Sequence, residues 1–424
     1  MTRVLVVGSG GREHALAWGL ARSPAVDEVI CAPGNPGMAA IGECIAVAAS
    51  DPAAVRDLAA KLDTDLVVVG PEDPLVAGVV DAIEDSGRLA FGPRAAAARL
   101  EGSKAWMKDV LAAAGVPSAR YGVFRAGEDD AALTFLETLP GLYVIKTDGL
   151  AGGKGVVVTE SLDEARDAVR AYLSGAAFGA AGTTCVIEEG LRGPELSVFA
   201  LCDGVRAEFV AAAQDHKRAF DGDAGPNTGG MGAYSPVPFV GDEVIDTVMH
   251  RAIEPTLAEL ARRGAPFRGV LFCGLMLTPD GPKVLEYNVR FGDPECQVIV
   301  PRLDSDLYAH LHESATGALV TPVRLSPDAC VGVTLAAEGY PPAPAHKGDP
   351  IGGLDAAHDG VTVFHAGTAF DDAGQVVATG GRVLTVTARA GDVAQARDRA
   401  YRAISQISWT GVHYRHDIAA QALT

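Results

Sequence analysis

The sequence contains little cysteine, and no two cysteines are spaced as a pair. Seven are scattered over 424 residues without a CxxC motif. Such an odd, dispersed set is typical of reduced thiols in a cytosolic core and excludes a disulfide framework. There is also no signal peptide before the first strand, and no apolar run of the about 18 residues that a membrane-spanning helix needs. We therefore expect a cytoplasmic protein that does not bind membranes.

Basic residues are also scarce. Lys and Arg total 35 against 54 Asp and Glu, which gives a formal net charge of −19. Nucleic-acid binding needs a basic surface, so this balance argues against it. A small, locally basic pocket for a phosphorylated metabolite remains compatible with the charge. The length, at roughly 150 residues per domain, predicts about three domains.

The first hundred residues alternate between apolar strand patterns and helical patterns. The strand patterns lie at 3–8, 28–34, 65–72 and 89–93, and the helical patterns lie at 12–23, 52–62 and 74–87. Short glycine-rich turns separate them. This alternation predicts an α/β domain over residues 1–101, with a doubly wound parallel sheet joined by right-handed crossovers.

The pattern changes after residue 101. We expect a helix at 102–115, a linker at 116–124, a hairpin at 144–158, a helix at 161–175, a strand at 184–191, strands near 195–213, a helix near 242–263 and strands near 268–288. Beyond about residue 325, strand patterns at 329–341, 361–370 and 380–390 precede a helical pattern at 393–407. These predict a separate mixed α+β domain over residues 325–424.

The hairpin VIKTDGLAGGKGVVV at 144–158 carries two lysines around a glycine run. A Walker-type P-loop needs a lysine followed by Ser or Thr and then a helix. Here Lys154 is followed by Gly155 and a strand, so the pattern favours a hairpin lid. A lone lysine is usually a solvated charge, but Lys146 closes an apolar strand. Its ammonium would be partly desolvated unless it met phosphate oxygens.

The turn Gly8-Ser9-Gly10-Gly11 follows the first strand, at a helix N-terminus where backbone amides favour anions. The dinucleotide-binding fingerprint requires a third glycine, and Glu13 occupies that place. No acidic residue closes the second strand either. The turn therefore supports two interpretations, a tight structural turn or a phosphate or substrate site, and gives little support to NAD binding.

Three polar clusters follow. The stretch VIEEGLRGPELSV (186–198) supports two interpretations, a charged turn or the end of a strand that binds a nucleotide. In KVLEYNVRFGDPE (283–295), Glu286 and Asn288 stand two apart on a strand and so face the same side. Two hard oxygen ligands suit Mg²⁺, which completes its shell with water and phosphate. The stretch QDHKRAFDGDAGPNTGGMGAYSP (214–236) predicts a long loop of the kind that is commonly functional.

Together these features resemble the ATP-grasp superfamily and, within it, the glycinamide ribonucleotide synthetase family. The resemblance covers nearly the whole chain. It rests on GSGGREHALAW, APGNPG, VVGPEDPLVAGVVD, FGP, LEGSKAWMKD, KTDGLAGGKGV, QDHKR, GPNTGGMGAYSP, EYNVRFGDPE, VFHAGT and TGGRVL. It implies a preATP-grasp domain at 1–101, an ATP-grasp domain at 102–320 with a lid at about 120–191, and the C-terminal domain.

The resemblance also implies a reaction in purine synthesis. ATP, glycine and 5-phosphoribosylamine would give ADP, phosphate and glycinamide ribonucleotide through glycyl phosphate. The cofactor would be Mg²⁺ or Mn²⁺, the partners would be these small molecules alone, and the chain would act as a monomer or weak dimer. Two alternatives are another ATP-grasp carboxylate–amine ligase and a non-catalytic ATP-sensing module.

Site residues follow from the resemblance in four groups. For ATP binding they are Lys104, Lys146, Gly152, Gly153, Lys154, Gly155, Glu188, Glu189, Leu191 and Glu195, with Lys146 at the α/β phosphates, the backbone of Glu188 and Leu191 at adenine, and Glu195 at ribose. For metal binding they are Glu286 and Asn288. For catalysis they are Arg290 at the transferred phosphoryl group, Lys217 near the acyl phosphate and Asp215 at the glycine ammonium. For substrate binding they are Gly8, Gly10, Gly11, Arg12, Glu13, Asp215, Gly230 and Asp293.

One departure from the broader superfamily concerns the strand before Glu286. That strand, GVLFCGLML at 269–277, contains no carboxylate, whereas many superfamily members carry an additional acidic metal ligand there. A second metal held fully by protein ligands is therefore not expected.

Overall fold

The N-terminal region is a parallel α/β sheet. A computed structural model describes residues 1–149, 155–175, 183–341, 346–355 and 360–423. Its first sheet has the order β3-β2-β1-β4-β5, with every pairing parallel. The strands are β1 (Arg3–Gly8), β2 (Glu28–Pro33), β3 (Glu43–Cys44), β4 (Leu66–Val69) and β5 (Leu89–Phe91). Because β1 lies in the centre, the chain winds outward in both directions, as predicted for a doubly wound sheet.

Helices cover this sheet, and one of them differs from the prediction. α1 (Gly11–Leu20) and α3 (Pro52–Leu62) lie where their patterns predicted. The single helix expected at 74–87 is two helices, α4 (Glu72–Ala77) and α5 (Val79–Asp85). Gly78 between them has a φ of 89°, a left-handed conformation that ends α4 and that glycine adopts without strain.

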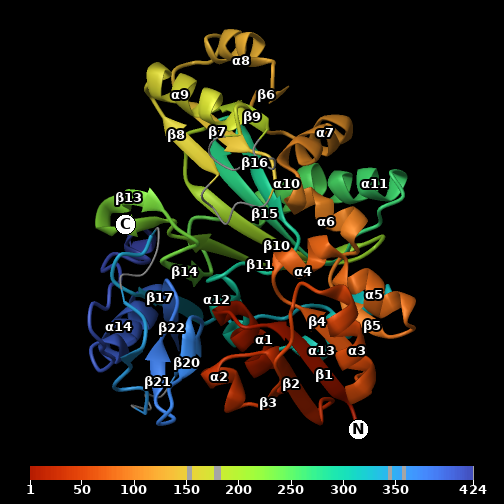
Figure 1. Ribbon diagram of the computed structural model, residues 1–424, viewed down its shortest axis with the longest axis vertical. Helices are drawn as coiled ribbons and strands as arrows, with labels where there is room; N and C mark the ends of the chain where they lie inside the picture. Colours follow the sequence, from red (N-terminus) through yellow and green to blue (C-terminus); the bar gives the residue numbers. More distant parts are fainter. Residues whose placement is uncertain (150–154, 176–182, 342–345, 356–359, 424) are drawn as a thin grey trace.

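A small four-stranded sheet, named the lid here after the predicted lid region, lies at the top of Figure 1. Its order is β6-β9-β7-β8, from β6 (Tyr121–Arg125), β7 (Tyr143–Thr147), β8 (Val156–Thr159) and β9 (Thr184–Glu189). Helices α8 (Asp129–Leu136) and α9 (Leu162–Leu173) pack on it and give it a core of its own. The two strands of the predicted hairpin are confirmed as β7 and β8. The predicted linker at 116–124 was wrong in part, because β6 pairs with β9 there.

One eight-stranded sheet runs from the centre of the molecule into its C-terminal part. Its order is β16-β15-β10-β11-β14-β17-β22-β19. The strands are β10 (Glu195–Asp203), β11 (Ala207–Asp215), β14 (Gly232–Ser235), β15 (Arg268–Thr278), β16 (Gly281–Asn288), β17 (Ala329–Ala336), β19 (Val361–His365) and β22 (Arg382–Ala390). The β14–β17 pairing therefore joins the centre of the chain to its C-terminal strands.

The remaining elements surround these sheets (Figure 1). They are α2 (Pro36–Ala39), α6 (Ala95–Gly102), α7 (Lys104–Ala114), β12 (Arg218–Phe220), β13 (Ala224–Asn227), α10 (Asp242–Val248), a π-helical turn (Met249–Ile253), α11 (Glu254–Arg262), α12 (Cys296–Ile299), α13 (Leu307–Thr316), β18 (Asp349–Pro350), β20 (Thr368–Phe370), β21 (Val376–Ala378) and α14 (Val393–Ile404). Within the described ranges, no helix has the length and apolar character that a bilayer crossing requires.

Two buried histidines join the N-terminal and C-terminal regions. His14 Nδ1 on α1 accepts a hydrogen bond from the backbone N–H of His365 at 2.8 Å, and the two rings lie 5.7 Å apart. Asn35 Nδ2 donates to the carbonyl oxygens of Ser9 and His365, at 2.9 and 2.8 Å. Burial lowers the pKa of His14 to about 3, with a contribution from His365, and burial lowers the pKa of His365 to about 4. Both rings are therefore neutral near pH 7.

This interface predicts a loss of stability in mild acid. The folded-state pKa of each histidine lies below its unfolded value, so the unfolded chain takes up protons first as the pH falls below about 6.5. The free energy of unfolding should fall by about 2 kcal/mol per histidine between pH 8 and pH 5. In urea unfolding, the free energy of unfolding of His365→Asn should fall by about 2 kcal/mol less than that of the parent between pH 8 and pH 5. The exposed-site control His250→Asn should match the parent, and equal pH dependence in both variants would contradict the prediction.

Candidate active site

A cavity of about 910 Å³ lies between the lid and the eight-stranded sheet. Most of the predicted site residues line it together: Arg12, Lys104, Lys146, Gly155, Glu188, Glu189, Leu191, Glu195, Asp215, Lys217, Glu286, Asn288, Arg290 and Asp293. Gly8, Gly10, Gly11, Glu13 and Gly230 are not among the residues that line it. Gly152, Gly153 and Lys154 lie outside the described residues.

Lys146 on β7 is held by an internal carboxylate. Its Nζ lies 2.8 Å from Glu188 Oε1 and donates to the carbonyl oxygen of Leu285 on β16 at 3.2 Å. The other oxygen, Glu188 Oε2, lies 2.9 Å from Lys108 Nζ. Burial alone would raise the pKa of Glu188, but Lys146 and Lys108 outweigh it and the pKa is lowered. Glu188 is therefore an ionised carboxylate with two ammonium partners.

Lys104 begins α7, where the lid strand β7 ends. Its Nζ donates to the carbonyl oxygen of Gly149 at 3.1 Å. Next to it, Asp148 accepts hydrogen bonds from Ser103 Oγ at 3.0 Å and from the backbone N–H of Ala105 at 3.1 Å. Burial lowers the pKa of Lys104, although Glu286 opposes the shift. The first turn of α7 thus fixes the base of the hairpin and places a lysine at the cavity.

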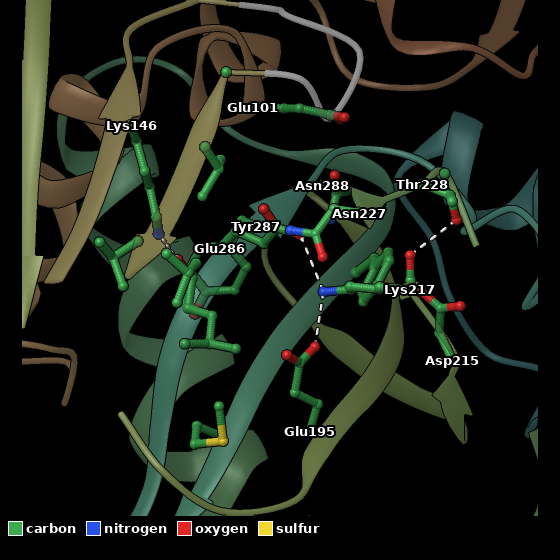
Figure 2. Close-up of a pocket in the computed structure, with 18 of the residues that line it drawn as sticks. Glu101, Lys146, Glu195, Asp215, Lys217, Asn227, Thr228, Glu286, Tyr287 and Asn288 are labelled. Atoms are coloured by element: carbon green, nitrogen blue, oxygen red, sulfur yellow. Dashed lines mark hydrogen bonds and ion pairs between the residues drawn. The ribbon is translucent and has the colours of Figure 1, made fainter. Parts of the chain in front are cut away.

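Glu286 and Asn288 on β16 provide two oxygen donors of the kind a hard metal ion needs. Lys217 Nζ lies 2.9 Å from Glu195 Oε2 and 3.8 Å from Glu286 Oε1, so it stands between the two carboxylates (Figure 2). Burial would raise the pKa of Glu286, but Lys217 and other lysines lower it, so the group is ionised. Asn288 Oδ1 accepts from Arg290 at 3.1 Å.

This donor set fits Mg²⁺. Throughout the described part of the chain, no group of three or more His, Cys, Asp or Glu residues could hold a metal ion. Mg²⁺ is usually held by one or two protein carboxylates together with water and substrate phosphates. An ionised carboxylate and an amide oxygen two residues apart match that requirement without a third protein ligand.

Two further carboxylates, Asp215 and Glu295, form an acidic end of the cavity. Asp215 Oδ1 is buried and has no hydrogen-bond partner among the residues that the structure describes. Glu295 Oε1 accepts from Ser197 Oγ at 3.3 Å. Burial raises the pKa of both groups, and the negative charge of Glu295 adds to the shift of Asp215. A cationic ligand at this end would meet carboxylates whose negative charge is only partly neutralised by neighbouring cations.

Arg290 and Arg12 share the carboxylate of Glu72. Glu72 Oε2 lies 3.1 Å from Arg290 Nε and 3.6 Å from Arg12 Nη1, and Glu101 Oε1 lies 2.9 Å from Arg290 Nη2. Burial opposes ionisation of Glu72, but the two arginines lower its pKa to about 2. Burial raises the pKa of Glu101 to about 7, although the positive charge of Arg290 acts to lower it. Glu101 was not among the predicted site residues, since it reaches Arg290 only through the tertiary fold.

The glycine turn after β1 is filled by Glu13. Its Oε2 accepts the N–H of Gly10 at 2.7 Å, and its Oε1 pairs with Arg12 Nε at 2.5 Å. A Cβ at Gly8 would lie 2.5 Å from Glu13 Cγ, and one at Gly70 would lie 2.2 Å from Glu13 Oε1. Glu13 therefore packs inside the turn, and its substrate contact stays a prediction, as does that of the turn itself.

The C-terminal region contributes Arg382, which the sequence did not single out. Its Nη1 donates to the carbonyl oxygens of Gly229 at 2.6 Å and Asp293 at 2.5 Å, and its Nη2 lies 3.1 Å from Asp293 Oδ2. Tyr340 Oη accepts from the N–H of Gly229 at 3.1 Å. In the sequence, the only local indication of a role for Arg382 was the pair of glycines before it in TGGRVL. Nothing in that stretch indicated the distant residues that Arg382 contacts.

The two sheets facing each other across a lysine-lined cavity, with an acid–amide pair on one strand, define an ATP-grasp protein. Residues 102–296 match the ATP-grasp (A) domain of phosphoribosylglycinamide synthetase, residues 2–101 its N domain and residues 330–421 its C domain. The chain belongs to the phosphoribosylglycinamide synthetase family.

Relatives match over nearly their full lengths. The chain is 50% identical to a phosphoribosylamine–glycine ligase of Brucella melitensis over 424 residues, covering 99% of this chain and 98% of that one. It is 50% identical to the enzyme of that name from Streptomyces coelicolor, covering 99% of each. The crystal structure of a Thermotoga maritima phosphoribosylamine–glycine ligase superposes with a TM-score of 0.87 at 34% identity, covering 99% of this chain and 100% of that one.

Removal of the Arg382 guanidinium should destabilise the fold. Arg382→Met leaves the Asp293 carboxylate without its cation and the Gly229 carbonyl without its donor, so we expect a loss of about 2 kcal/mol. Arg382→Lys should lose less stability than Arg382→Met, because the positive charge remains. Urea unfolding measures both, with Arg170→Met on the lid as an exposed control expected within about 0.5 kcal/mol of the parent. A Met variant as stable as this control would contradict the role of Arg382.

Proposed function

We propose that this protein joins glycine to 5-phosphoribosylamine at the expense of ATP, giving glycinamide ribonucleotide, ADP and phosphate in purine synthesis. The observation that carries the proposal is one cavity with two chemically distinct ends. Lysines and the Glu286–Asn288 pair line one end, and the partly uncompensated carboxylate of Asp215 lies at the other. A triphosphate suits the first, and an amino-acid ammonium suits the second. The names and full-length similarity of the relatives support the same reaction.

The nucleotide would lie between the lid and β16. Lys104 and Lys146 would bind its phosphates, and the backbone of Glu188 and Leu191 with the neighbouring Glu189 would face adenine. Glu195 would face the ribose. The glycine hairpin would close over the triphosphate through the backbone of Gly155 and, outside the described residues, of Gly152 and Gly153 together with Lys154. The lining of the cavity by the described members of this set supports the assignment.

Glu286 and Asn288 would hold Mg²⁺, or Mn²⁺, at the phosphates. When bound, the metal would neutralise phosphate charge and orient the triphosphate. The ionised state of Glu286 and the place of both residues in the cavity wall support this pair. Release of Lys217 from Glu286 would accompany metal binding, because the two cations compete for one carboxylate.

The residues of the chain would position two successive substitutions. A carboxylate oxygen of glycine attacks the γ-phosphorus and ADP leaves, which yields glycyl phosphate. The amine of phosphoribosylamine then attacks the acyl carbon, phosphate leaves and the nitrogen loses a proton. Asp215 would hold the glycine ammonium, Lys217 would lie near the acyl phosphate, and Arg290 would stabilise charge on the transferred phosphoryl group.

Phosphoribosylamine would occupy the remaining side of the cavity. Arg12 and Asp293 line that side, which supports their assignment as substrate contacts. Gly8, Gly10, Gly11, Glu13 and Gly230 would act behind them, through the turn and the loop that hold these residues. We further propose a cytoplasmic location and a monomer or weak dimer. All seven cysteines are free thiols, which supports a reducing compartment.

The reaction predicts a strict dependence of ADP release on both substrates. ADP should form at the full rate only with glycine and phosphoribosylamine together, and omission of glycine should reduce it to background. A coupled assay with each substrate omitted in turn measures this dependence. An ATP-sensing module would bind ATP without releasing ADP, and a different carboxylate–amine ligase would require another pair of substrates.

Glu286 provides a second test. Glu286→Gln removes the carboxylate charge but keeps the shape, so the Mg²⁺ concentration for half-maximal activity should rise at least about 100-fold. Mn²⁺ binding followed by electron paramagnetic resonance should weaken in parallel. The exposed Glu243→Gln serves as the control and should leave both values unchanged. Normal Mn²⁺ binding in Glu286→Gln would show that the metal assignment is wrong.

A further inference from the structure

A fully buried lysine, Lys108, lies behind the cavity wall. Its side chain is 0% exposed, and Lys108 is not among the residues that line the cavity. Its Nζ lies 2.9 Å from Glu188 Oε2 and 5.3 Å from the centre of the Tyr121 ring. Lysine is almost never fully buried unless it is paired, because its ammonium loses its hydration. The nucleotide-binding assignments leave this residue without a role.

Lys108 stands one helical turn after Lys104 on α7, so the two side chains project from the same face of the helix. Lys104 reaches the cavity, whereas Lys108 points beneath it to Glu188. The backbone carbonyl of Lys108 also accepts from Tyr121 Oη on the lid strand β6 at 3.1 Å. This part of α7 is therefore fixed against the lid at the point where Glu188 lies.

The charges around Glu188 do not balance. Lys108 lies on one oxygen of the carboxylate and Lys146 on the other, at 2.9 and 2.8 Å. One negative charge with two positive charges leaves a net charge of +1 on a buried cluster. Without Lys108, Glu188 and Lys146 would form a neutral pair. An anion in the cavity would then meet a lysine whose charge was already compensated from within the protein.

We propose that Lys108 is a positioning residue for nucleotide binding, which neutralises Glu188 so that Lys146 presents an uncompensated positive charge to the phosphates. The inference rests on the proposed function, which assigns Lys146 to those phosphates. Lys108 acts only through Glu188, since it has no access to the ligand. Glu188 in turn holds Lys146 in place, together with the carbonyl oxygen of Leu285 at 3.2 Å.

The count of charges gives a test that distinguishes the proposed role of Lys108 from a purely structural one. Lys108→Met should weaken binding of ADP with Mg²⁺ about 10-fold or more, measured by isothermal titration calorimetry on the full chain. The double variant Lys108→Met/Glu188→Gln removes one charge of each sign and restores the net charge to +1. It should recover affinity to within about 3-fold of the parent. If the double variant binds ADP as weakly as Lys108→Met or more weakly, the inference is wrong.

Steady-state kinetics add a second readout. In Lys108→Met the KM for ATP should rise while the KM for glycine stays within about 2-fold of the parent, because Asp215 lies at the other end of the cavity. A parallel rise in both would indicate general damage and overturn the inference. Lys108→Gln, which can still donate a hydrogen bond to Glu188, replaces the Met variant throughout if that variant does not fold.

Lys146→Met separates this inference from the function on which it rests. It should weaken ADP binding at least as much as Lys108→Met. If Lys146→Met binds ADP like the parent, the phosphate assignment of Lys146 fails and this inference fails with it. If Lys146→Met binds weakly while Lys108→Met binds like the parent, the proposed function stands and only the role of Lys108 is refuted.

Discussion

Backbone hydrogen bonds between β14 and β17 connect the two halves of the eight-stranded sheet, and the cavity depends on this pairing. On one side lie β10, β11, β15 and β16, which carry Glu195, Asp215 and Glu286. On the other side lies β22, which begins with Arg382. A sheet is stiff across its strands, so the pairing holds the guanidinium of Arg382 against the Gly229 carbonyl and Asp293. The site is built across the sheet and not within one domain.

Several cations that line the cavity are held by carboxylates of the protein. Lys146 is paired with Glu188, Lys217 with Glu195, and Arg290 with Glu72 and Glu101. Such pairs keep charged side chains in fixed positions. A phosphorylated ligand competes with these internal anions for the cations, so affinity depends on how completely each cation is compensated beforehand. Selectivity for a highly charged ligand follows from that competition.

The parts predicted from the sequence are those set by local pattern. Alternating apolar runs identified the parallel sheet, and the two-residue spacing of Glu286 and Asn288 placed both on one strand. Three other features were beyond such reasoning. Lys108 meets Glu188 across 80 positions of sequence, and Arg382 meets Gly229 across 153, so no local spacing records either contact. The break at Gly78 was missed because apolar periodicity continues through it.

The long-range closure of the cavity also bears on how the protein is made. A nascent chain leaves the ribosome from its N-terminus, and domains generally fold as units in that order. The parallel sheet and the lid can form early, yet the wall near Asp293 stays open until the strand that begins at Arg382 has been synthesised. A translation intermediate shorter than this therefore carries every lysine of the cavity but lacks the arginine that secures the Gly229 turn. The contacts that secure this wall are therefore added in the last part of synthesis.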